Sequence, residues 1–281
     1  MRTLSTKIAV GFAAAAAVSL TLSACSGTTE PAADGAGSDL DLVNAGTLTV
    51  CISKNAYEPM YWNDGGTLTG FDVDAITAIA GELDLDVTFS EMAFDGLLPA
   101  LTSGRCDVLR SGLYINDDRK AAADAIGYLQ TGPALVVPVD GELTFEEADD
   151  LSGARVAVQA ASANEKILQE LSADFESRGM AAIEISSYPE LPETMAALTN
   201  GRVDATMETD VAAAQAAKTL GDDYELAADL FAAETEFGMF LQKDSPLTAT
   251  IHGIAVELTE DGTFATLAEQ YGLLPTRLVT P

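Results

Sequence analysis

The sequence predicts an α/β protein with two similar lobes, each built on a sheet rich in parallel strands. From Thr47 onward, segments with strand-like and helix-like apolar spacing alternate, as they do in βαβ units. Residues 100–107 (ALTSGRCD) are nearly repeated at 197–204 (ALTNGRVD), about one small domain further along the chain. With 281 residues and 48% apolar content, the chain is long enough to form two packed cores.

The first local unit runs from residue 47 to residue 92. Residues 47–53 (TLTVCIS) predict a strand, residues 71–83 carry apolar side chains at helical spacing, and residues 87–92 (VTFSEM) are β-rich. A further helical stripe begins at Phe94 and ends at Gly104. This order predicts a helix that connects two parallel strands.

The near-repeat predicts where a ligand would bind. In both copies a helix ends on Gly and a strand begins just after an Arg, so each copy is expected in its own lobe. The strands that follow end near residues 110–112 and 208–210. Because ligands of open parallel sheets sit beyond the carboxyl ends of strands, these two ends are expected to form opposite walls of one cleft.

A helix start is expected in the same region. Residues 155–159 (RVAVQ) predict a strand, and Ser162 and Glu165 after it have capping-box spacing. Free backbone N–H groups at such a start can hold an anion or a carbonyl oxygen.

Charge and composition exclude several classes of function. The chain has 44 Asp and Glu against 14 Lys and Arg, a formal net charge of −30, so nucleic acid would be repelled. One His, three Cys and no CxxC pair leave too few ligands for a structural zinc site, and a catalytic triad would need His252. We therefore expect no metal and no cofactor.

The N-terminal segment predicts export. Arg2 and Lys7 precede an apolar run that is shorter than a membrane span, which is typical of a signal peptide over residues 1–24. The run ends in Leu22-Ser23-Ala24-Cys25, which resembles the bacterial lipobox, and Cys25 would then carry a lipid. The alternative is ordinary secretion with cleavage near the same Ala. Residues 25–39 are small, polar and rich in Pro and Gly, and predict a flexible tether.

Cys51 and Cys106 are predicted to remain free, buried thiols. Both are expected inside strands, Cys51 late in one and Cys106 at the start of another, and parallel neighbours would hold them too far apart for a disulfide.

A series of short motifs in a fixed order resembles a known family. The motifs are Gly46-Thr-Leu-Thr-Val50, Tyr57-Glu-Pro59, Gly70-Phe-Asp-Val-Asp74, Phe94-Asp-Gly-Leu-Leu-Pro-Ala100, Gly104-Arg-Cys-Asp107, Ser111 to Arg119, Leu151-Ser-Gly153, Gly201-Arg-Val-Asp204, Asp261-Gly-Thr-Phe264 and Tyr271-Gly272. Together they resemble the family 3 extracellular solute-binding proteins, which feed polar amino acids and similar molecules to ABC importers.

The resemblance implies a two-lobed type II periplasmic-binding-protein fold. Lobe 1 would comprise residues 40–134 plus 239–281, and lobe 2 residues 135–238, with hinge crossings near residues 131–138 and 236–241. The implied protein is a monomeric, lipid-anchored binding protein on the outer face of the bacterial cytoplasmic membrane. Its partners would be a small-molecule ligand and an ABC permease, and it would touch the membrane only through the N-terminal lipid.

The resemblance also implies a set of ligand-binding residues. Arg119 matches the Arg that clamps the ligand carboxylate, and the alternative is a helix-end salt bridge to Asp117 or Asp118. The other candidates are strand-end, aromatic, helix-start and acidic positions: Tyr57, Trp62, Phe94, Arg110, Ser111, Gly112, Tyr114, Ser162, Ala163, Thr209 and Asp210. For Arg110 a structural acid is the alternative partner, and for the aromatics it is a place in the core.

Departures from the family pattern leave the ligand open. Tyr114 stands where a small hydroxyl residue is usual, Ala163 loses a hydroxyl, and the Asp that commonly binds an α-ammonium falls on Thr209, beside Glu208 and Asp210. The ligand is thus an amino acid whose ammonium meets a neighbouring acid, or an aromatic carboxylate, amide or hydrazide without that group. The less favoured functions are a dehydratase that uses Glu208 or Asp210 as general acid, and a sensory or scaffolding lipoprotein.

Overall fold

The computed structural model describes residues 40–227 and 230–281. The predicted signal peptide (1–24), the lipid attachment at Cys25 and the tether (25–39) lie outside the described residues.

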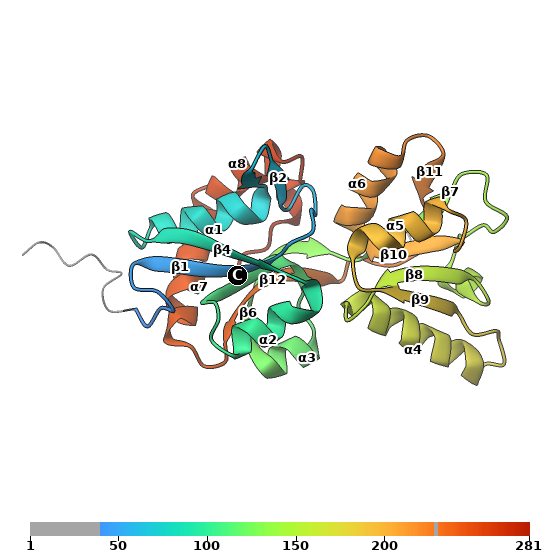
Figure 1. The fold of residues 1–281 in the computed structure, drawn as a ribbon, viewed down its shortest axis with the longest axis horizontal. Helices are drawn as coiled ribbons and strands as arrows, with labels where there is room; N and C mark the ends of the chain where they lie inside the picture. Colours follow the sequence, from blue (N-terminus) through green and yellow to red (C-terminus); the bar gives the residue numbers. More distant parts are fainter. Residues whose placement is uncertain (1–39, 228–229) are drawn as a thin grey trace, which may run out of the picture. The chain divides into compact units, whose positions relative to one another are not determined.

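Two five-stranded sheets organise the described part of the chain (Figure 1). The first has the order β4 (Asp86–Met92), β1 (Thr47–Ser53), β5 (Val108–Tyr114), β12 (Thr235–Gln242) and β6 (Ala123–Thr131). The second has the order β11 (Tyr224–Leu226), β7 (Pro133–Pro138), β10 (Ala205–Thr209), β8 (Arg155–Gln159) and β9 (Glu184–Tyr188). The elements built on each sheet are called the first and the second lobe, so the predicted two-lobed α/β fold is confirmed.

Each sheet is parallel on one side and antiparallel on the other. In the first, β1 is parallel to β4 and β5, whereas β12 is antiparallel to β5 and β6. In the second, β8 is parallel to β9 and β10, whereas β7 is antiparallel to β10 and β11. The chain enters the second lobe through the antiparallel strand β7 and returns to the first lobe through the antiparallel strand β12. A hairpin of β2 (Trp62–Asp64) and β3 (Thr67–Thr69) completes the strands.

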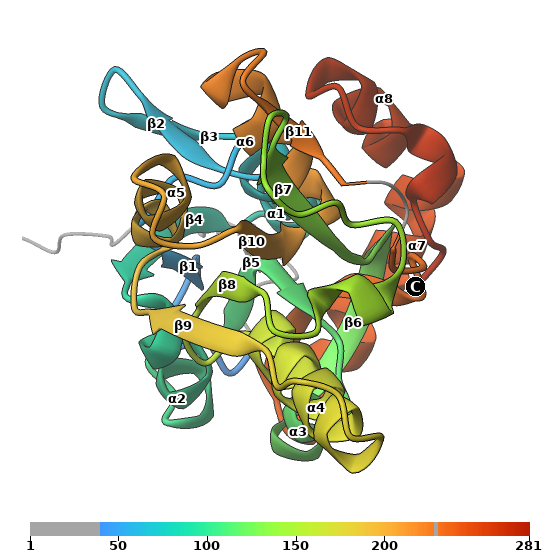
Figure 2. The ribbon, with the colours of Figure 1, turned by 90° about the vertical axis from the view of Figure 1, so that its right-hand side faces the viewer.

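Alternating side chains let helices cover both faces of each sheet. In β1, Leu48, Val50 and Ile52 pack against α1 (Phe71–Gly81), α7 (Pro246–Glu260) and α8 (Thr263–Gln270), whereas Cys51 faces α2 (Leu97–Thr102). In the second lobe, Val156 and Val158 face α4 (Ala163–Ser177), and Ala157 faces α5 (Leu191–Thr199) and α6 (Asp210–Leu220). Figure 2 shows α4 on one side of these strands and α5 and α6 on the other. The short elements are α3 (Asp117–Ala122), η2 (Phe94–Gly96), η3 (Ala148–Leu151) and η4 (Pro275–Arg277).

The sequence repeat builds the same connection in both lobes. Gly104 and Gly201 adopt positive φ angles of 73° and 66° after α2 and α5. The Asp that follows each then binds the neighbouring strand: the Asp107 carboxylate accepts from the Thr49 amide at 2.7 Å, and Asp204 accepts from the Arg155 amide at 2.8 Å. The repeat therefore places the central strands β5 and β10, whose ends were predicted to face a ligand.

The prediction of free thiols is wrong, because Cys51 and Cys106 form a disulfide. Cys106 lies in the turn before β5, not within the strand. The residue opposite Cys51 in the parallel pair is Leu109, so Cys106 is not held at the strand spacing and its Cα approaches that of Cys51 to 5.7 Å.

The chain crosses between the lobes at two points. The first crossing lies between Thr131 at the end of β6 and Pro133 at the start of β7, within the expected segment. The second precedes Thr235, because all of β12 belongs to the first sheet. The expected boundary between residues 238 and 239 therefore falls inside a strand.

Candidate ligand-binding site

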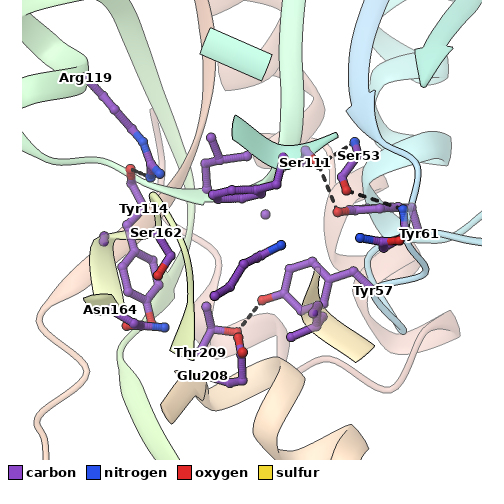
Figure 3. Close-up of a pocket in the computed structure, with 17 residues that line it drawn as sticks. Ser53, Tyr57, Tyr61, Ser111, Tyr114, Arg119, Ser162, Asn164, Glu208 and Thr209 are labelled. Atoms are coloured by element: carbon purple, nitrogen blue, oxygen red, sulfur yellow. Dashed lines mark hydrogen bonds between the residues drawn. The ribbon is translucent and has the colours of Figure 1, made fainter. Parts of the chain in front are cut away.

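A cavity lies where the carboxyl ends of strands from both sheets meet (Figure 3). Ser53 ends β1, Tyr114 ends β5, Gln159 ends β8 and Thr209 ends β10, and all four line this cavity. The expectation that the two repeat-following strands form opposite walls is therefore confirmed.

Most of the predicted site residues line the cavity. They are Tyr57, Phe94, Ser111, Gly112, Tyr114, Arg119, Ser162, Ala163 and Thr209. The remaining lining residues were not among the predicted ligand contacts, although Glu208 was expected nearby as an acid: Ser53, Asn55, Tyr61, Leu113, Gln159, Asn164, Leu191 and Glu208.

Arg119 is a buried cation without a carboxylate partner in the described part of the chain. The Asn116 side chain caps α3 by accepting from the Arg119 amide at 2.9 Å, and the guanidinium donates to the Tyr114 carbonyl at 2.7 Å. Asp117 and Asp118, its expected alternative partners, pair instead with Lys120 and Lys166. Burial lowers the pKa of Arg119 to about 10, which leaves it charged at neutral pH.

Glu208 brings a buried acid to the same cavity from the other lobe. It is the penultimate residue of β10, with 6% of its surface exposed, and its carboxylate meets the Thr194 hydroxyl at 3.5 Å. Burial raises the pKa of Glu208 to about 8. Glu208 was not among the predicted ligand contacts; the sequence offered it only as an acid next to Thr209 that could meet an ammonium or act as the general acid of a dehydratase. The signal for it is an acid at the end of an otherwise uncharged, buried strand (ATMET).

Tyr57 and Thr209 connect the two walls. Their hydroxyl groups are hydrogen-bonded, and the Thr209 oxygen also caps α6 by accepting from the Ala212 amide at 3.1 Å. Gly112, at φ +59°, faces the Tyr57 ring, and a Cβ built there would lie 2.3 Å from a ring carbon. Only glycine lets the ring lie against this strand.

Hydroxyl groups order the wall next to Tyr57. The Ser111 hydroxyl accepts from the Ser53 amide at 3.0 Å and donates to the Tyr61 hydroxyl at 2.9 Å. Tyr61 thus positions Ser111 at the cavity.

The start of α4 forms part of the opposite wall. Ser162 accepts from the Glu165 amide at 3.0 Å, and the Glu165 carboxylate accepts from the Ala161 amide at 2.8 Å. The predicted helix start is confirmed, although the reciprocal bond goes to the residue before the cap. Ser162, Ala163 and Asn164 bring the positive end of a 15-residue helix to the cavity.

Three predicted contacts lie outside the cavity lining. Arg110 points into the core of the first lobe and pairs with Asp72, the structural alternative. Trp62 packs edge-on against Tyr271, with ring centroids 5.8 Å apart. The Asp210 carboxylate accepts from Thr131 at 2.5 Å and pairs with Arg277. Each of these side chains is turned to a protein partner.

The fold and the cavity define a class of protein. Two α/β lobes, joined by two crossings, enclose a cavity at the carboxyl ends of both sheets, which is the arrangement of a type II periplasmic solute-binding protein. The family described as bacterial extracellular solute-binding proteins, family 3, matches residues 48–273. The chain belongs to this family.

Individual relatives and solved structures agree with this family membership. The L-cystine-binding protein TcyJ of Escherichia coli (strain K12) is 28% identical over 229 residues, covering 80% of this chain and 82% of the relative. The arginine-binding protein ArgT of Corynebacterium glutamicum is 27% identical over 234 residues, covering 83% and 76%. An ancestral arginine-binding protein bound to arginine is 29% identical with a TM-score of 0.73, covering 80% of this chain and 98% of its own.

The family defines the kind of activity. Its members are extracellular binding proteins, so the chain binds a solute and is not an enzyme. In residues 40–227 and 230–281, none of the helices combines the length and the apolar character that a membrane crossing requires.

Proposed function

We propose that this chain is the substrate-binding protein of an ABC importer that captures an amino acid between Arg119 of the first lobe and Glu208 of the second. One observation carries the proposal: among the described residues, the buried Arg119 guanidinium has no acidic partner and the buried Glu208 carboxyl has no basic partner, and both line the same cavity. A zwitterion supplies both missing charges.

Arg119 would hold the ligand carboxylate. Its planar fork matches two carboxylate oxygens, and the Tyr114 carbonyl and the α3 backbone fix its position. A charge-assisted hydrogen bond of this kind contributes about 1.5–3 kcal/mol. Amides at the start of α4 would add donors from the opposite lobe.

Glu208 would meet the ligand ammonium. Thr209 stands where the family commonly has an Asp, and the hydroxyl of Thr209 is already engaged by Tyr57 and the α6 backbone. Glu208 is adjacent in sequence and lines the cavity. A carboxylate that is costly to bury alone becomes favourable once a cation shares its site.

Ligand binding would stabilise the closed arrangement of the lobes. Tyr57 with Thr209, and Lys54 with Glu190 at 2.8 Å, already join residues of the two lobes around the cavity. A ligand that contacts both lobes binds the closed state better than an open one and shifts the population toward it.

Calorimetric titration with the standard amino acids tests this proposal. We expect at least one of them to bind and to raise the melting temperature, and Arg119→Ala to weaken that binding at least tenfold. Arg105→Ala, which removes an exposed Arg outside the cavity, is the matched control and should bind normally. Unchanged binding by Arg119→Ala would contradict the carboxylate assignment.

The location of the protein forms a further part of the proposal. Leu22-Ser23-Ala24-Cys25 supports cleavage of a signal peptide and lipid attachment at Cys25, which would hold a monomer on the outer face of the membrane. Metabolic labelling with a fatty-acid analogue should mark the protein, and Cys25→Ala should abolish the label. A labelled Cys25→Ala variant would refute the anchor site.

A further inference from the structure

Tyr114 is a large side chain held in place at the cavity wall. Its ring stacks on Phe237 with centroids 5.7 Å apart and an interplanar angle of 24°, and its carbonyl accepts from Arg119 at 2.7 Å. Tyr114 and Phe237 are also direct partners of the antiparallel β5–β12 pair. In Figure 3 the ring extends from the Arg119 guanidinium toward Asn164.

The surrounding aromatic residues prevent Tyr114 from moving aside. Phe237 has no exposed surface and contacts Tyr57 and Tyr128, each with ring centroids 6.2 Å from its own. Packed aromatic cores of this kind deform little, because each ring is fixed by its neighbours. The Tyr114 ring is therefore a fixed part of the wall.

The cavity that remains is small. Its volume is about 40 Å³. The space is narrow because side chains of both lobes, among them Tyr57, Tyr114 and Leu191, line it. Asn164 Oδ1 and the Tyr114 hydroxyl lie buried at its edge, without a hydrogen-bond partner in the described part of the chain.

We propose that the Tyr114 ring restricts this site to amino acids with small side chains, such as glycine, alanine and serine. The inference rests on the proposed function and specifies its ligand. The α-carboxylate and α-ammonium would meet Arg119 and Glu208, and little volume would remain beyond them. A longer side chain would have to displace the stacked pair of Tyr114 and Phe237, because residues of both lobes line the rest of the cavity.

The test compares affinities for small and large amino acids by calorimetry in three proteins. The wild-type protein should bind glycine, alanine or serine at least tenfold more tightly than glutamine, histidine or arginine. Tyr114→Ser removes the ring and should raise the affinity for the larger set at least tenfold. Tyr114→Phe keeps the ring volume without the hydroxyl and should retain the wild-type order.

Each outcome separates the size limit from the proposed function. Equal or tighter binding of a large amino acid by the wild-type protein would overturn the size limit and leave amino-acid capture intact. If folded Tyr114→Ser shows the same ratio of affinities for small and large amino acids as the wild type, the size limit is also overturned and amino-acid capture remains. If Tyr114→Ser does not fold, the order measured in wild type and Tyr114→Phe decides. Binding of no amino acid of either size would overturn both.

Discussion

Arg110 and Asp72 form an ion pair in which neither side chain is exposed, with Nε 2.9 Å from Oδ1. The second Asp72 oxygen accepts from the Gly112 amide at 2.9 Å, and the Arg110 guanidinium lies 3.8 Å from the centre of the Tyr128 ring. Through Gly112, which lines the cavity, this buried pair fixes the course of β5 at the ligand site.

Loss of one partner of this pair should destabilise the protein strongly. Asp72→Ala leaves the Arg110 charge buried alone, and we expect the free energy of unfolding to fall by about 3–5 kcal/mol in urea denaturation. The double variant Asp72→Asn with Arg110→Met keeps an acceptor for Gly112 without buried charge and should recover much of the loss. A double variant no more stable than Asp72→Ala would contradict this account.

Glu208 should make stability depend on pH. Burial raises the pKa of Glu208 in the folded protein to about 8, from the ordinary value of 4.5 for a Glu side chain, so between these pH values the folded state holds more protons than the unfolded state. The stabilising contribution of this proton is therefore complete below about pH 4.5 and is lost as pH rises through about 8, at up to about 1.4 kcal/mol per pH unit. The free energy of unfolding, measured by denaturation at several pH values in this range, should fall with pH more steeply for the wild type than for Glu208→Gln. The same pH dependence in both proteins would contradict the prediction.

The same group should couple ligand binding to proton release. An ammonium needs the ionised form of Glu208, so below about pH 8 binding should release close to one proton, and the affinity should rise with pH. Calorimetry in buffers with different ionisation enthalpies measures this release directly. Glu208→Gln should release none. Proton-independent binding by the wild type would mean that Glu208 does not pair with an ammonium.

Local patterns predict the elements of this chain better than its side-chain environments. Residues 47–53 and 155–159 form the expected strands because their apolar composition and turn boundaries are local properties. The repeat and the rule for strand ends then place the cavity. Arg110 is different: a charged residue within VLRSGLY is acceptable only because Asp72, 38 residues away, is buried beside it, and no local pattern contains that pairing.

The disulfide shows the same limit and gives another prediction. Whether Cys51 meets Cys106 depends on the register of β1 and β5 and on where β5 begins. Replacing both cysteines with Ala should lower the free energy of unfolding by about 4 kcal/mol, from the chain entropy of a loop spanning 55 residues. Ligand affinity should persist, because neither cysteine lines the cavity. Equal stability with and without reductant would contradict the bridge.

Ion pairs that join the lobes should make ligand affinity sensitive to salt. Lys54 of the first lobe and Glu190 of the second are 2.8 Å apart, and Asn55 donates to the same carboxylate. Glu190 also begins the helix whose first residue, Leu191, lines the cavity. Because Lys54 and Glu190 belong to different lobes, separation of the lobes would break this contact, so we expect it to favour the closed state and thereby binding.

Lys54→Ala should therefore weaken ligand binding about two- to fivefold at low ionic strength, since exposed ion pairs are individually weak. The difference should disappear near 1 M salt, where the Debye length is about 3 Å. Lys243→Ala is the matched control, because Lys243 pairs with Asp124 at 3.2 Å within the first lobe and is similarly exposed. If both variants change affinity equally, the effect reflects net charge, and Lys54 with Glu190 has no part in closure.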